Sequence, residues 1–195
     1  MSTFKAWVLR ANAVGFTAGC QTLRPDGPRF ADLIKVEQGS LTIFGLIYDI
    51  RAQDDLVVRQ LIVGGRLEPE VILDQQVNRL VPLEIQVLAV GYRQDQTIVY
   101  GLPPQPPFSL ALMTVCPDSE LRAFSAHLDY LPLILNAGRV PVDELIVAHL
   151  RRLAAAQPSE VRPQFLLGAG RRLARWLNND LPRLEALLRR IRPTD

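Results

Sequence analysis

Pro103-Pro104-Gln105-Pro106-Pro107 separates two parts of this 195-residue chain that differ in apolar periodicity. Before these prolines, apolar residues alternate with polar ones in several segments, which is typical of strands with one buried face. After residue 116 they recur every three or four positions, which is typical of amphipathic helices. The sequence therefore predicts an α+β fold, in which a small N-terminal β-barrel is followed by a C-terminal helical region.

The part before the prolines contains about seven or eight strand-like segments, a number that suits a small barrel or sandwich. Alternation is clearest in residues 41–50 and 83–89. Gly45 lies inside the first of these, and a glycine in a strand is typical of a bulge or a close backbone approach where a sheet curls. We therefore expect a barrel rather than a sandwich. The other expected strands are residues 4–10, 14–23, 30–37, 96–102 and 108–115.

Two segments carry particular expectations. Residues 108–115 follow the prolines and are mostly apolar on both faces, which predicts a last strand that is buried. This strand moves the expected junction between strands and helices to residues 116–118. Residues 55–63 fit either a short helix or a strand, and the pattern does not decide between them.

Helical patterns follow the junction. A first segment begins near Pro117 and ends at residues 136–138, and a second begins at Pro141. Another helix is expected at residues 162–177. The last helix starts at Asp180, whose carboxylate can cap it, and the step Asn178-Asn179 turns these last two helices into an αα-hairpin. The second segment has an apolar stripe made of Val142, Leu145, Ile146, His149, Leu150 and Leu153.

Charge is distributed unevenly between the two ends of the chain. Residues 1–150 carry 12 Lys or Arg against 16 Asp or Glu, a net charge of −4, whereas residues 151–195 carry 10 Arg against 4 acidic residues, a net charge of +6. Such a cluster suits contact with nucleic acid or with an acidic protein surface. It also suits a solvated helix face, with arginines near the helix C-terminus. The candidate contact residues are Arg171, Arg172, Arg175, Arg183 and Arg190.

Motifs for catalysis or cofactor binding are missing. The chain has no G-x-x-x-x-G-K-[ST] phosphate loop, and Gly168 and Gly170 lack both the third glycine and the preceding strand of a dinucleotide motif. His127 and His149 do not have the spacing of metal ligands. Cys20 and Cys116 lie far apart, which favours two reduced, buried thiols. We therefore expect no cofactor, no metal site and no enzymatic activity. An enzyme without a local motif is the third alternative, and a deep pocket with convergent polar groups would favour it.

The chain also lacks membrane signals. No apolar stretch reaches the roughly 18 residues of a membrane span, and the N-terminus has no secretory pattern. The sequence therefore predicts a cytoplasmic protein that does not bind a membrane.

Three segments resemble a known family. They are FADLIKV at residues 30–36, IFGLIYDI at residues 43–50 and RLVPLEIQV at residues 79–87. With the proline-rich exit, their turns and strands are similar to the HAS-barrel, the small β-barrel shared by HerA-type DNA translocases and rotary ATP synthase subunits. The resemblance covers residues 4–115. In those ATPases the barrel precedes a phosphate-loop motor domain and supports ring assembly and partner docking.

This chain departs from the family after the barrel, because residues 116–195 are too few for a motor domain. The resemblance therefore implies a HAS-barrel-like unit at residues 1–116 and a helical region at residues 117–195, acting together as a noncatalytic assembly or docking module. It suggests a protein partner of the HerA-like, DNA-processing ATPase kind. The alternative is a nucleic-acid-binding protein that uses the Arg-rich helices. Self-association stays open.

Overall fold

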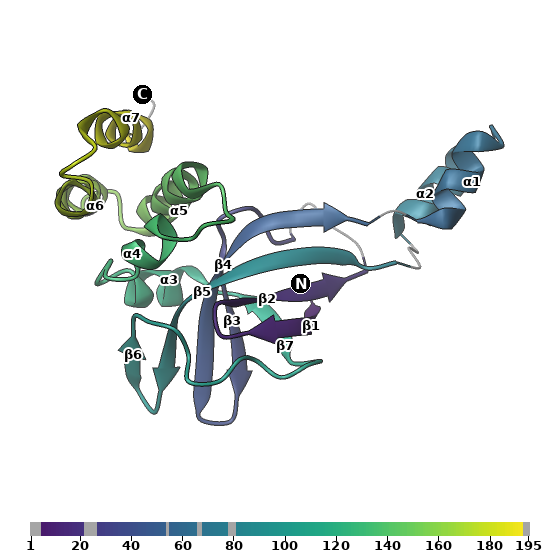
Figure 1. Ribbon diagram of the computed structural model, residues 1–195, viewed down its shortest axis with the longest axis horizontal. Coiled ribbons are helices and arrows are strands. Elements are labelled where there is room, and N and C mark those ends of the chain that lie inside the picture. Colours follow the sequence, from purple (N-terminus) through teal and green to yellow (C-terminus); the bar gives the residue numbers. More distant parts are fainter. Residues whose placement is uncertain (1–4, 22–26, 54, 66–67, 78–80, 193–195) are drawn as a thin grey trace.

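The computed structural model of the protein describes residues 5–21, 27–53, 55–65, 68–77 and 81–192. A β-barrel occupies the centre of the molecule, with a group of helices packed beside it (Figure 1). A separate helical pair projects from the barrel toward the other end of the molecule's longest axis. The α+β class predicted from the sequence is confirmed.

Six antiparallel strands close the barrel in the order β2-β1-β7-β3-β4-β5, and pairing of β5 with β2 completes the ring. A short additional strand, β6 (Thr97–Val99), pairs with β5 and extends the sheet beyond the ring. Residues 4, 22 and 23 of the predicted strands lie outside the described residues. The strands of the ring are β1 (Ala6–Asn12), β2 (Gly15–Cys20), β3 (Leu33–Gln38), β4 (Leu41–Ala52), β5 (Leu83–Gln94) and β7 (Leu112–Val115).

The strands predicted at residues 41–50 and 83–89 are confirmed as parts of β4 and β5, but the expectation of one buried face is wrong, because both faces are largely buried. Ile47, Ile85 and Val87 belong to the apolar cluster that fills the barrel interior, to which all six strands contribute. Phe44 and Leu46 point to the outer face and belong to a second cluster shared with the helices. Apolar side chains are therefore needed on both sides of the same wall.

Two glycines permit close approach of strands where the barrel curls. A Cβ on Gly15 would lie 2.1 Å from the carbonyl oxygen of Val87, and one on Gly45 would lie 2.3 Å from Val87 Cγ1. The register of β4 against β5 shifts beside Gly45. The bulge and close approach predicted from this glycine are therefore confirmed.

The prediction of a buried strand over residues 108–115 is wrong for its first half. Phe108 and Leu110 are 63% and 76% exposed, and the strand β7 begins only at Leu112. Leu110 has a φ of 64°, and this left-handed conformation interrupts an extended strand. This apolar run therefore resembles a buried strand in sequence, but its first half is exposed.

The segment left open between helix and strand is a helix. α1 (Leu56–Val63) begins after Asp55, whose side chain accepts a hydrogen bond from the Val57 amide. α2 (Pro69–Val77) follows it before the chain returns to β5. We call these two helices, residues 56–77, the α1–α2 arm.

The C-terminal region consists of helices, as predicted. The segment expected between Pro117 and residue 138 is divided into two short helices, α3 (Asp118–Phe124) and α4 (Leu131–Leu135). The longer helices are α5 (Val142–Ala156), α6 (Arg162–Trp176) and α7 (Leu181–Ile191). Asp180 caps α7 by accepting a hydrogen bond from the Arg183 amide, so the predicted cap is confirmed. The pair α6 and α7 is called the α6–α7 hairpin.

The helices and one wall of the barrel share a core. Leu33, Phe44 and Leu46 of the barrel lie in the same apolar cluster as Phe124 and Leu150 of the helices. Polar contacts cross the same boundary. Asp32, at the start of β3, forms an ion pair of 2.6 Å with Arg152 of α5, and Lys35 lies 2.7 Å from Glu120 of α3. The helices therefore pack tightly against the barrel.

Candidate functional site

The predicted contact arginines divide into two groups in the structure. Three of them have acidic partners outside the hairpin: Arg172 pairs with Asp129, Arg183 with Asp143, and Arg190 with Glu144. The Nε and Nη2 atoms of Arg183 donate to the same Asp143 oxygen at 2.8 and 2.7 Å. These pairs bring the hairpin against the rest of the helical region, which reduces the charge that they offer to a ligand.

Arg171 and Arg175 form the second group. They lie one turn apart on the exposed side of α6, and within the described part of the chain neither has a charged partner. Trp176, next to them, is 57% exposed. The contact surface predicted on the hairpin is therefore concentrated on these two arginines, and its role stays a prediction.

His149 has a structural role. It is fully buried, and its Nδ1 lies 3.2 Å from the carbonyl oxygen of Ala31, which can only accept. Nδ1 therefore carries the proton, and Nε2 accepts from the Tyr130 hydroxyl at 2.8 Å. Burial lowers the pKa of His149 to about 4. A neutral imidazole whose nitrogens both have partners joins α5 to the barrel and is not exposed to a substrate.

The two cysteines are free and buried, as predicted. Cys20 lies in the barrel interior and Cys116 in the core shared with the helices. Burial raises the pKa of the Cys20 thiol to about 11 and raises that of Cys116 further. Both are therefore neutral thiols at neutral pH, which makes them poor nucleophiles.

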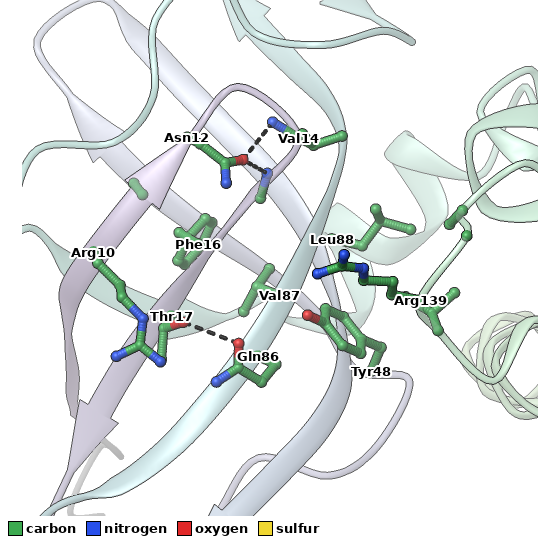
Figure 2. Close-up of a pocket in the computed structure, with 15 residues that line it drawn as sticks. Arg10, Asn12, Val14, Phe16, Thr17, Tyr48, Gln86, Val87, Leu88 and Arg139 are labelled. Carbon is green, nitrogen blue, oxygen red and sulfur yellow. Dashed lines mark hydrogen bonds between the residues drawn. The ribbon is translucent and has the colours of Figure 1, made fainter.

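A groove of about 540 Å³ lies between the barrel wall and the α4–α5 connection. Its floor is made of β2 and β5, and its opposite wall is made of residues 137–140. Figure 2 shows Arg10 at one end of this groove and Arg139 near the other. Arg139 points from the connection toward the barrel, in the direction of Tyr48. We call this hollow the barrel groove.

A chain of hydrogen bonds holds the polar side chains along the floor of the barrel groove. Arg10 donates from Nη1 and Nη2 to the two Glu84 oxygens at 3.0 and 2.7 Å. Gln86 donates from Nε2 to Glu84 at 3.2 Å and accepts at Oε1 from the Thr17 hydroxyl at 2.9 Å. The Arg10 guanidinium holds the pKa of Glu84 below its usual value, against the opposing effect of burial. These side chains are thus fixed before any ligand arrives.

The sequence did not reveal this groove. Glu84 and Gln86 occupy the polar positions of an alternating strand, which predicts exposure, yet they are only 7% and 8% exposed. Their partner Arg10 is 74 positions from Glu84, and Arg139 lies in a loop. No local spacing connects these residues, because closure of the barrel brings them together.

The α1–α2 arm is a further candidate site. No residue of α1 is buried, and the large apolar side chains Leu56, Ile62 and Val63 are strongly exposed. On α2, Ile72 and Leu73 are exposed as well. The arm therefore presents apolar surface on both helices, and none of its described residues belongs to either apolar core cluster.

Comparison with models of known protein families gives no match, and comparison with curated proteins gives none either. Among the described residues, none of the helices has the length and apolar character needed to cross a membrane. Within the same part of the chain, there is no group of three or more His, Cys, Asp or Glu side chains that could hold a metal ion. The functional argument therefore depends on the geometry of the hairpin, the groove and the arm.

Proposed function

We propose that this protein is a noncatalytic docking module and that its α1–α2 arm binds a protein partner. The observation that carries the proposal is the exposure of Leu56, Ile62, Val63 and Leu73 on a pair of helices that projects from the barrel (Figure 1). Contiguous exposed apolar surface on a soluble domain is typical of an interaction site. Burial of each such side chain is worth about 1.5–3 kcal/mol, so a partner that covers several of them gains substantial affinity.

The class of partner follows from the resemblance to HAS-barrels. A closed antiparallel barrel of six strands is consistent with that resemblance. In HerA-type translocases such a barrel is joined to a phosphate-loop motor, and this chain has no phosphate loop. We therefore propose that the partner is a separate, HerA-like DNA-processing ATPase, with the barrel and helices acting as its assembly module.

Co-purification from the cells that make the protein tests this function. The test variant combines Ile62→Ser and Leu73→Ser, and the matched control combines Leu167→Ser and Leu181→Ser, which remove comparably exposed apolar side chains from α6 and α7. We expect quantitative mass spectrometry to find a phosphate-loop ATPase with the unmodified protein and the control, and a loss of at least tenfold with the test variant. Equal recovery with both variants would contradict docking through the arm.

A second candidate function is nucleic-acid binding through the hairpin. The observation that favours it is that Arg171 and Arg175 lie exposed on one side of α6, with no acidic partner in the described residues. Phosphate contacts by such arginines give an affinity that falls steeply with salt. Fluorescence anisotropy with a labelled DNA duplex measures this dependence. We expect the double variant Arg171→Glu and Arg175→Glu to lose binding and Arg139→Glu to keep it; unchanged affinity in the double variant would eliminate this function.

A further inference from the structure

We infer that the barrel groove is a binding site for a small molecule that carries a carboxylate or phosphate group on an apolar body. The volume of about 540 Å³ lies within the usual range for small-molecule sites, roughly 300–1,000 Å³. This site is separate from the arm and from the hairpin. The inference therefore does not depend on which partner the protein docks.

The charge of the barrel groove favours an anion. Among the described residues, those that line the groove include Arg10 and Arg139 but no Asp or Glu. Both oxygens of Glu84, the partner of Arg10, already accept from Arg10, so the charge of this carboxylate is compensated. Arg139 is exposed and has no acidic partner in the described residues, which leaves a net positive charge on the groove. A concave, partly apolar wall strengthens such a field.

The donors of the groove are held in place for recognition. The Arg10 side chain is 61% exposed, so its guanidinium keeps N–H groups available beyond the two that it gives to Glu84. Gln86 has its amide orientation set by Glu84 and Thr17. Side chains that are fixed in advance lose less conformational entropy when a ligand binds. Arg10, held by Glu84, and Arg139, which extends from the opposite wall, therefore place a guanidinium group at each end of the groove, and the anionic group of a ligand can pair with either one (Figure 2).

The remaining surface of the groove accepts an apolar body. Val14 and Val140 line opposite walls, and Leu88 and Tyr48 lie near Arg139. An aromatic ring or short hydrocarbon chain placed against Leu88 and Tyr48 keeps its charged end within reach of Arg139. A ligand with both features gains affinity from apolar contact and from charge-assisted hydrogen bonds. A ligand with only one of these features should bind more weakly.

Nuclear magnetic resonance of the ¹⁵N-labelled protein tests the inference with three probe molecules, each of which contains a phenyl ring. Phenyl phosphate and phenylacetate represent the two anion classes, and benzyl alcohol is the uncharged control. We expect both anions to shift the amide signals of Val14, Gly15, Leu88 and Val140. The tighter of the two shows which class of anion, phosphate or carboxylate, the groove prefers. Benzyl alcohol is expected to bind at least tenfold more weakly.

The variant Arg139→Ala, compared with Arg175→Ala, separates this site from general attraction to a basic protein. Both arginines are exposed and lack an acidic partner in the described residues, so the two changes remove the same charge at different places. We expect Arg139→Ala to weaken binding at least tenfold and Arg175→Ala to leave it unchanged. Absent shifts in the groove, shifts centred on α6, equal losses in the two variants, or equal binding of benzyl alcohol would each overturn the inference.

Discussion

The α1–α2 arm and the α6–α7 hairpin are both pairs of consecutive helices, yet only the hairpin is packed. In the hairpin, Leu173, Leu184, Leu187 and Ile191 are buried in the core shared with the barrel. In the arm, α1 buries no residue. Both pairs carry apolar side chains, so the contrast shows that an apolar helix face is covered only where another element of the chain lies opposite it.

The two pairs also differ in charge. Residues 56–77 of the arm carry three Asp or Glu against two Arg, a net charge of −1, whereas residues 162–191 of the hairpin carry seven Arg against two acidic residues, a net charge of +5. Ion pairs of Arg183 and Arg190 with Asp143 and Glu144 connect α7 to α5. The hairpin is therefore part of the folded unit with a basic outer side, and the arm is the surface on which the proposed docking depends.

The largest difference is expected from deletions. Ala52 pairs with Leu83 where β4 meets β5. A two-residue Asn-Gly turn in place of residues 53–82 therefore removes the arm and should preserve the pairing of β4 with β5 and the cooperative unfolding of the protein. A chain that ends at residue 116 exposes Leu33, Phe44 and Leu46 and should lose its cooperative transition. Thermal unfolding followed by circular dichroism distinguishes the two deletion variants. A stable, monomeric chain 1–116 would show that the barrel folds independently.

Single apolar truncations should give the next largest difference. Leu187→Ala removes a side chain that is 1% exposed and should lower the free energy of unfolding by about 2–5 kcal/mol. Ile62→Ala in the arm removes a side chain that is 60% exposed and should change it by less than about 0.5 kcal/mol. Urea unfolding measures both. Similar losses would mean that the arm is covered within the protein's own fold.

Acid should lower the free energy of unfolding through His149, which is buried between α5 and the barrel. Its pKa of about 4 in the folded protein lies below the ordinary value near 6.5, so between these pH values the unfolded chain binds more protons and acidification favours unfolding. From pH 7 to pH 5 this group should remove about 2 kcal/mol of stability. His149→Gln should lack this loss when urea unfolding is compared at the two pH values. An equal pH dependence in both proteins would exclude His149 as the cause.

The smallest effect is expected from the ion pair between α7 and α5. Arg183 and Asp143 side chains are 32% and 42% exposed, so solvent screens their attraction. Arg183→Ala should lower stability by about 0.2–1 kcal/mol, and the difference should shrink at high salt. Arg175→Ala is the matched control, because Arg175 lacks such a partner among the described residues, and it should leave stability unchanged. Chemical denaturation at two salt concentrations measures both.

The candidate sites were visible in the sequence to different degrees. The arginines of the α6–α7 hairpin stood out in the sequence because there are many of them. Which of them have acidic partners did not. Among the described residues, Arg172, Arg183 and Arg190 have such partners, whereas Arg171 and Arg175 do not. The barrel groove was missed entirely, because Arg10, Gln86 and Arg139 come from three distant segments. Partners that are far apart in the chain leave no spacing that a sequence pattern detects.

Local chemistry in the sequence determined the elements: alternation along β4 and β5, Gly45 at the bulge, and Asp180 at the start of α7. These features act over a few residues, so they are readable without a structure. Other features depend on the arrangement of the elements in space: Phe108 and Leu110 are exposed, Glu84 and Gln86 are buried, and one helical pair packs while the other projects (Figure 1). Burial depends on what lies opposite a side chain in space, and this is set by barrel closure and by helix packing.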